Sequence, residues 1–175
     1  GIGQGFMTAS PLQLAVATAA IANKGQLLSP QLLMHSQTEN GEIYEDDKKP
    51  AHQIPIKDIN NWELIIESMK QVVYGKLGTA RRLNHKLTYT LAGKTGTSQV
   101  FSLDPEEEYI AEDIEEKLRD HALFTGFAPI EDPQVAIAVI IENAGSGSST
   151  AAPLARALLD VYFIKNPIKE NSSSD

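Results

Sequence analysis

Apolar residues recur along this chain at two spacings, and the two spacings predict different elements. In residues 11–22 and 60–74 they fall three or four positions apart, as on one face of a helix. In residues 122–128 and 134–142 they form short runs bounded by turn residues, which is typical of strands. A last helical stripe follows at Leu154, Leu158, Val161 and Tyr162. The pattern therefore predicts a mixed fold of helices and strands.

The helical segments carry start and stop signals. Ser10, followed by a proline and by Gln13, forms a capping box, and Gly25 lies where a left-handed residue ends a helix. The second segment repeats the capping pattern at Asn60 and Glu63. Its wide apolar stripe predicts a core helix that ends before Gly75, and it comprises Trp62, Ile65, Ile66, Met69 and Val73.

The strand of residues 134–142 is apolar on both faces, because valines and isoleucines alternate with alanines. This pattern predicts a central strand with helices packed closely against it. Four other segments are polar. We expect a surface excursion in residues 37–55, an exposed charged helix in residues 104–120, a flexible connector at residues 145–149 and a polar tail at residues 166–175.

Composition excludes several classes of function. With 15 basic and 23 acidic residues the net charge is -8, which argues against a nucleic-acid partner. The chain has no cysteine for disulfide or thiolate chemistry, and its histidines show no ligand spacing, so we expect neither a metal nor a cofactor. No apolar run approaches the roughly 20 residues of a membrane-spanning helix. Because the chain starts on Gly1 and not on methionine, we expect it to be a piece of a longer protein.

A cation, two threonines and a glycine interrupt the apolar alternation of residues 91–100, at Lys94, Thr95, Gly96 and Thr97. Without a side chain at Gly96, an extended peptide can approach the strand edge closely. Thr95 and Thr97 offer hydroxyls to a carboxylate, and Lys94 supplies the positive charge. These residues suit an anionic, peptide-like ligand. The structural alternative is an ordinary edge strand, in which lysine discourages aggregation and threonine has β propensity.

Three stretches together resemble the C-terminal half of the transpeptidase domain of class B penicillin-binding proteins. Lys94–Thr97 matches the third catalytic motif of that family. The other stretches are similar to its elongation-type member, penicillin-binding protein 2. They are Ile2–Gly5 with Thr8–Ala15, and Leu118–His121 with Phe127–Pro129, Pro133–Ala138 and Glu142–Gly145. The similarity covers nearly the whole chain and favours the ligand-binding interpretation.

The resemblance implies an α/β (α+β) fold of the penicillin-binding and serine β-lactamase type, with an antiparallel sheet between helices. The family's sheet has five strands, of which this chain would provide three. The strand of residues 135–141 should then lack a neighbour, which favours self-association, a partner fragment or local rearrangement. We expect a partial transpeptidase domain in residues 1–165, with the helical part in about 1–85 and the strands and last helix in about 86–165.

The resemblance also implies a serine D,D-transpeptidase that cross-links peptidoglycan stem peptides and is acylated by β-lactams. Lys94 would orient the substrate and tune proton transfer, with Gly96 lining the site. Thr95 and Thr97 would bind the terminal carboxylate of D-alanyl-D-alanine or of a penicillin, and the Thr97 N–H would form half of the oxyanion hole. The parent protein would be anchored in the bacterial inner membrane, with this domain in the periplasm and elongation-complex membrane proteins as partners.

The family's nucleophile is missing from this sequence. Neither Ser-x-x-Lys nor Ser-x-Asn occurs in it; Ser68 is followed by Lys70 two positions later, which on a helix faces elsewhere. We therefore expect the chain alone to be inactive and to need the missing N-terminal half of the domain. Two alternatives stay open. One is a serine β-lactamase or penicillin-sensing domain, and the other is a non-catalytic module that binds peptides by edge addition.

Overall fold

The body of the protein is built on an antiparallel sheet. The computed structural model describes residues 8–33, 35–45, 52–100 and 115–168. The sheet has three strands in sequence order, namely β5 (Ala92–Ser98), β6 (His121–Ala128) and β7 (Val135–Ile141). Both edges of this sheet lack a further strand among the described residues. The predicted strand after residue 134 is therefore confirmed, but it lies at an edge of the described sheet and not at its centre.

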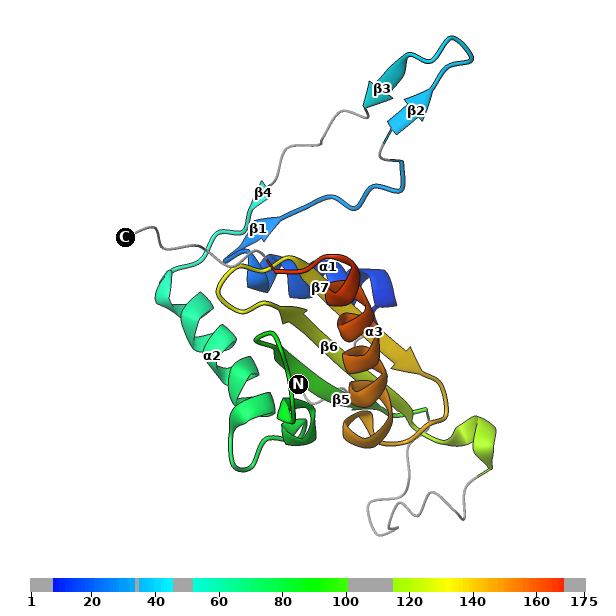
Figure 1. Cartoon of the computed structure of the whole chain (residues 1–175). Coiled ribbons are helices and arrows are strands. Elements are labelled where there is room, and N and C mark those ends of the chain that lie inside the picture. Colours follow the sequence, from blue (N-terminus) through cyan, green and yellow to red (C-terminus); the bar gives the residue numbers. More distant parts are fainter. Residues whose placement is uncertain (1–7, 34, 46–51, 101–114, 169–175) are drawn as a thin grey trace.

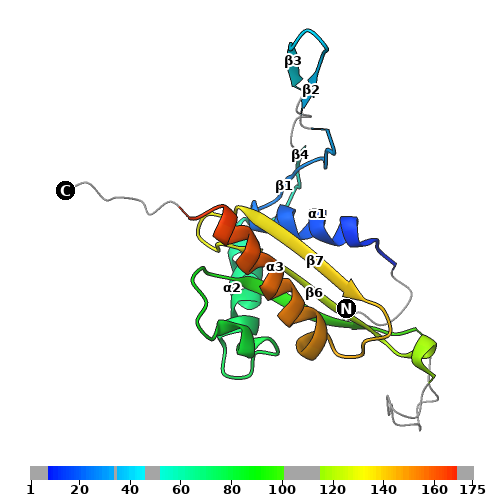
Figure 2. The same cartoon turned by 45° about the vertical axis from the view of Figure 1, so that its right-hand side comes forward.

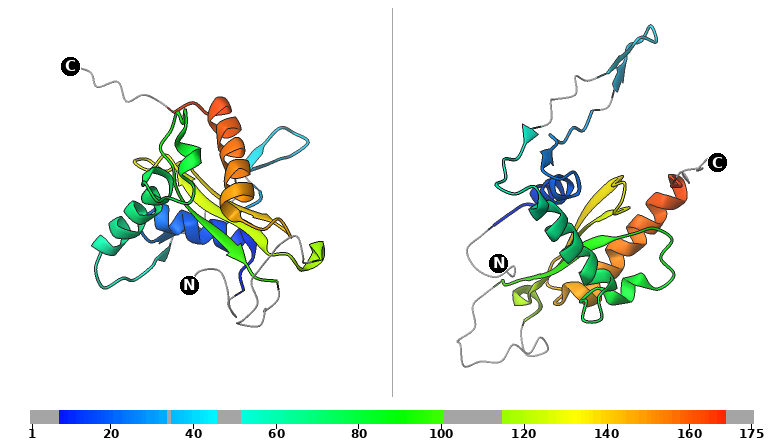
Figure 3. Two further views of the ribbon diagram at one scale, coloured as in Figure 1. Left: turned by 90° about the horizontal axis from the view of Figure 1, so that it is seen from below. Right: turned by 90° about the vertical axis from the view of Figure 1, so that its left-hand side faces the viewer.

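Helices cover both faces of the sheet. Helix α3 (Ala152–Lys165) packs on one face, and α1 (Pro11–Ala22) lies across the other (Figures 1 and 3). Helix α2 (Asn60–Tyr74) packs along β5. This arrangement confirms the expected antiparallel sheet between helices. Within the described residues, no helix combines the length and apolarity needed to cross a bilayer.

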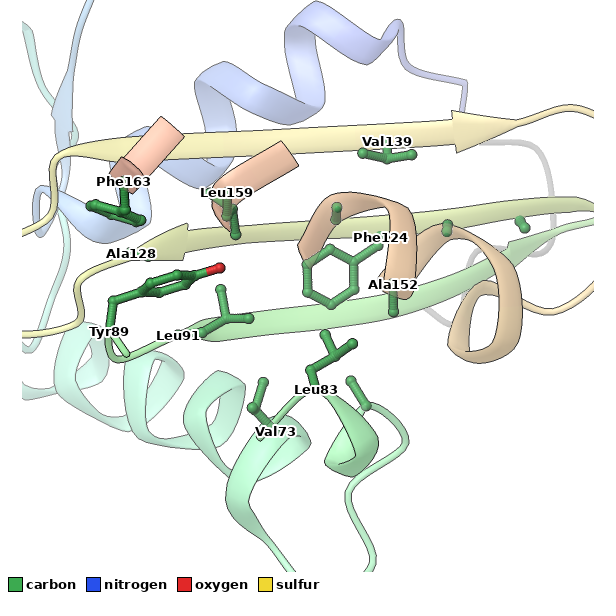
Figure 4. Close-up of a cluster of buried hydrophobic side chains, with 14 residues drawn as sticks. Val73, Leu83, Tyr89, Leu91, Phe124, Ala128, Val139, Ala152, Leu159 and Phe163 are labelled. Carbon is green, nitrogen blue, oxygen red and sulfur yellow. The ribbon is translucent and has the colours of Figure 1, made fainter. Parts of the chain in front are cut away.

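A side chain of β6 fixes the larger of two apolar cores. Phe124 is fully buried, and its ring lies over Gly93 and Gly126, which face each other across β5 and β6. A Cβ atom at either glycine would collide with this ring. Figure 4 shows Phe124 surrounded by side chains from α2, the segment after it, the sheet and α3. They include Val73, Leu83, Leu91, Val139, Ala152 and Leu159. The pair of glycines thus lets an aromatic ring rest directly on the sheet.

The opposite face of the sheet carries a smaller core. Ala92 and Phe127 of the sheet pack there against Ala22 of α1 and against Ile66 and Met69 of α2. Because successive residues of a strand point to opposite faces, Leu91 and Ala92 contribute to different cores. Helix α2 contributes to both of them and so joins the two layers beside β5.

The expected surface excursion is a two-stranded arm that projects from the body (Figures 1 and 2). Its base and tip are each an antiparallel pair. The strands are β1 (Gln26–Leu27) with β4 (His52–Gln53), and β2 (His35–Gln37) with β3 (Ile43–Glu45). The arm begins at the end of α1, about ten residues earlier than the sequence predicted.

Helix starts were predicted with mixed success. At α1 the capping box is confirmed: the Gln13 N–H donates to Ser10 Oγ at 3.2 Å, and the Ser10 N–H donates to Gln13 Oε1 at 2.8 Å. At α2 the capping box at Asn60 is wrong. There Asp58 Oδ1 accepts the Asn60 N–H at 2.9 Å, so a carboxylate two residues upstream replaces the expected cap. Ile65, expected in the core, is 40% exposed.

The predicted apolar face of the last helix is wrong for three of its four residues. Leu154, Leu158 and Val161 are exposed, and only Tyr162 packs, partly buried, against the core. The buried residues of α3 are Ala152, Ala155, Leu159 and Phe163. The predicted flexible connector is partly wrong as well, because residues 147–151 form a π-helical turn, η4, that leads into α3. Small side chains at the start of α3 allow close approach to the sheet, and this contact decides which stripe is buried. The charged helix expected from residue 104 lies mostly outside the described residues.

Neighbouring leucines of α3 provide a test of this assignment. We expect Leu159→Ala to lower the free energy of unfolding by about 2–5 kcal/mol, because it empties a fully packed site. Leu158, which is 50% exposed, is the matched control, and its alanine variant should cost less than about 1 kcal/mol. Urea unfolding of both variants measures the difference. A larger loss of unfolding free energy for Leu158→Ala than for Leu159→Ala would support the apolar face predicted from the sequence.

Candidate functional site

The four residues singled out by sequence lie together on β5, at one edge of the described sheet. Lys94, Thr95, Gly96 and Thr97 pair with Thr125, Phe124, Leu123 and Ala122 of β6. The register therefore holds one side of this segment against the sheet. The other side has no strand partner in the described part of the chain, as peptide addition to a strand edge requires.

The side chains of this segment differ sharply in exposure. Lys94 is exposed, Thr97 is half-buried and Thr95 is only 8% exposed. The Lys94 ammonium donates to the carbonyl oxygen of Thr95 at 2.6 Å, and it makes no ion pair with any described carboxylate. Its positive charge is thus held at the strand and stays uncompensated by a neighbouring acid.

Packing requires a glycine less strictly at position 96 than at position 93. A Cβ at Gly96 would lie 3.3 Å from Leu123 Cβ, a tight contact with one side chain. A Cβ at Gly93 would instead overlap the Phe124 ring and lie 3.0 Å from the Thr125 carbonyl oxygen. The fold therefore depends on Gly93 more than on Gly96.

The structure adds a residue that the sequence did not indicate as part of the site. Thr79 Oγ1 lies 2.7 Å from Thr95 Oγ1, and either hydroxyl can be the donor. Thr79 lies just before a 3-10 helix, η1 (Arg81–Asn84). The two threonines are 16 positions apart, and no periodic pattern relates such positions.

A cluster of polar residues lies where β5 ends and β6 begins. His121, which pairs with Ser98, accepts the Asn143 N–H at Nδ1 at 3.0 Å and so holds the start of β6 to the segment after β7. The neighbouring Asp120 is 5% exposed, and burial raises the pKa of its carboxyl group above the ordinary value. The Val100 N–H and the charge of His121 lower the pKa of Asp120 by a smaller amount.

No group of histidine, aspartate and glutamate side chains in the described ranges is placed to hold a metal ion. Strand β5 itself carries an ammonium group, hydroxyl groups and backbone N–H donors. Such groups bind carboxylates and stabilise oxyanions.

Comparison with known proteins gives consistent matches along the chain. The family model of the penicillin-binding protein transpeptidase domain matches residues 1–160. Two curated relatives are peptidoglycan D,D-transpeptidases MrdA. The Haemophilus influenzae protein is 42% identical over 168 residues, or 93% of this chain and 25% of its own length. The Escherichia coli K12 protein is 42% identical over 162 residues, or 91% of this chain and 25% of its own length. The chain thus spans about a quarter of these relatives.

Solved structures match over a similar extent. Pseudomonas aeruginosa PBP2 in complex with WCK 5153 has a TM-score of 0.75 at 39% identity, covering 99% of this chain and 35% of that one. Helicobacter pylori PBP2 in its complex with MreC has a TM-score of 0.71 at 29% identity, covering 93% of this chain and 26% of that one.

The raised pKa of Asp120 predicts a pH-dependent contribution to stability. Because the folded protein retains this proton to higher pH than the unfolded chain, the free energy of unfolding falls as pH rises from about 3.9 through the folded pKa. Asp120→Asn removes this dependence. In urea titrations, the stability of the wild type minus that of Asp120→Asn should therefore fall across this window. The exposed Asp132→Asn variant is the control, and a difference that rises with pH would contradict the assignment to burial.

Proposed function

This chain belongs to the penicillin-binding protein transpeptidase family, and we propose that it is the substrate- and β-lactam-binding half of a peptidoglycan D,D-transpeptidase. The parent enzyme cross-links stem peptides through an acyl-serine intermediate. Its serine lies outside this chain, which contains no Ser-x-x-Lys. The chain is therefore inactive by itself and corresponds to a partial domain in residues 1–165.

The observation that carries this proposal is the Lys94–Thr97 segment on an unpaired strand edge. An extended D-alanyl-D-alanine terminus pairs with this edge, and Gly96 leaves room for its backbone. The hydroxyls of Thr95 and Thr97 hold its carboxylate in the positive field of Lys94. Exposure of Lys94, together with its lack of a carboxylate partner among the described residues, supports this role.

The reaction also requires a hydrogen-bond donor for the oxyanion, and in this proposal the backbone N–H of Thr97 is that donor. The serine oxygen attacks the carbonyl carbon of the stem peptide or of the β-lactam. The C–N bond then breaks, and the departing nitrogen takes up the proton that the serine hydroxyl gave up. The oxyanion formed during the attack accepts a hydrogen bond from the Thr97 N–H, a donor worth about 2.7–4 kcal/mol in comparable acyl transfer.

Partners and location are also part of the proposal. Because a PBP2 from Helicobacter pylori was solved with MreC, we extend a partner of that kind to the parent of this chain. The parent is placed in the bacterial inner membrane, with this domain in the periplasm, where it serves cell elongation and cell shape and is a target for β-lactams and resistance. The unpaired edge of β7 receives a strand from the missing half or, in the isolated chain, from a second copy.

Intact-mass measurement after incubation with a reactive penicillin tests the proposed function. We expect no adduct on this chain alone and one adduct on the chain extended upstream to include Ser-x-x-Lys. An adduct on the short chain would overturn the claim that the nucleophile lies elsewhere. The absence of an adduct on both chains would favour a non-catalytic peptide-binding module.

Two glycine variants of the extended chain separate binding from folding. Gly96→Ala should lower the rate of penicillin acylation by about 10- to 100-fold, because it displaces the ligand from the strand edge. Gly93→Ala should instead lower stability, by about 1–3 kcal/mol, because its methyl group meets Phe124. Acylation rates and urea midpoints are measured for both. Equal loss of stability in the two variants would contradict the ligand-side role of Gly96.

A further inference from the structure

The hydrogen bond between Thr79 and Thr95 joins the proposed carboxylate-binding strand to a loop that follows α2. Thr95 is almost fully buried, so few groups reach its hydroxyl. Among the described residues, the side chain hydrogen-bonded to this hydroxyl is that of Thr79, with 2.7 Å between the two Oγ1 atoms. The orientation of the Thr95 hydroxyl is therefore coupled to the position of Thr79.

The loop holds Thr79 rigidly. The residue before it, Gly78, sits so close to the last turn of α2 that a Cβ there would lie 2.7 Å from the Gln71 carbonyl oxygen and even nearer to that of Val72. The residue after it, Ala80, is buried in the larger core, and its N–H donates to the Val72 carbonyl oxygen at 3.0 Å. Both neighbours of Thr79 are thus fixed against α2, which preorganises its hydroxyl beside β5.

The charges around Thr79 favour one direction for the hydrogen bond. Thr79 lines a pocket of about 570 Å³ together with Lys76, Arg81 and Arg82, and none of these cations pairs with a described carboxylate. A hydroxyl next to positive charge turns its oxygen toward the cations and its proton away from them. For Thr79, the proton then points to the oxygen of Thr95.

We propose that Thr79 is a positioning residue for the substrate carboxylate: it donates to Thr95 and leaves the Thr95 proton for the ligand. A carboxylate can only accept hydrogen bonds, so Thr95 must donate to it, and its oxygen then needs a donor of its own. Thr79 supplies that donor, and such a chain of hydroxyls strengthens the final hydrogen bond. This inference rests on the proposed function, in which Thr95 binds the carboxylate.

A double-mutant cycle in the extended chain tests the role of Thr79. The second-order rate of acylation by a penicillin is measured for wild type, Thr79→Val, Thr95→Val and the double variant. We expect Thr79→Val to lower the rate by about tenfold, the scale of one hydrogen bond to a charged group, and to cost almost nothing further in the Thr95→Val background. Thr79→Ser, which keeps the hydroxyl, should restore the rate to within about twofold.

Controls separate positioning from folding. Thr88→Val changes an exposed threonine that lines a different pocket and should leave the rate unchanged. Equal losses from Thr79→Val in the presence and absence of the Thr95 hydroxyl would overturn the proposal, because the effect would then not pass through Thr95. So would a Thr79→Ser variant as slow as Thr79→Val.

The two proposals fail separately. If the extended wild type takes no penicillin adduct, the proposed function fails. The same four proteins are then compared by their equilibrium dissociation constants for acetyl-D-alanyl-D-alanine and for its C-terminal amide. Thr79→Val should then weaken binding of the carboxylate form and spare the amide. Equal weakening of both forms, or no weakening of either, would overturn the role of Thr79.

Discussion

The contact of the Phe124 ring with a cross-strand pair of glycines is the constraint on which the rest of the structure depends. Gly93 and Gly126 face each other in β5 and β6, and neither position has room for a Cβ beneath the ring. With Phe124 lying flat on the sheet, side chains from α2, α3 and the segment between α2 and β5 close around it. The register of β5 against β6 is thereby fixed, because a one-residue slip would place a side chain under the ring.

That register also determines what the candidate site presents. Gly93 lies one residue before Lys94, so the packing of the ring and the chemistry of the site belong to one strand. Alternation along the strand directs Thr95 to the face of Gly93, where it is buried and meets Thr79, and leaves Lys94 on the opposite face, exposed. A single strand therefore anchors the core and carries the groups that we propose to bind a carboxylate.

Helix α2 connects the two cores to the site. Its residues enter both apolar layers, and the loop at its end is pressed against its last carbonyl groups at Gly78. The position of Thr79 beside Thr95 is thus a consequence of how α2 packs along β5. The edge of β5 that faces away from β6 has no strand partner among the described residues, so the candidate site lies on an open strand edge.

The sequence by itself determined the local features: the capping box at Ser10, the strands around residues 122–128 and 134–142, and the motif at Lys94. These features depend on residues a few positions apart or on a contiguous motif. Only the tertiary structure decided that Leu159 and not Leu158 is buried, and that Thr79 reaches Thr95. Both outcomes depend on how closely elements that are distant in sequence approach one another. Glycine and alanine residues set that distance, and no local sequence pattern shows which residues they will pack against.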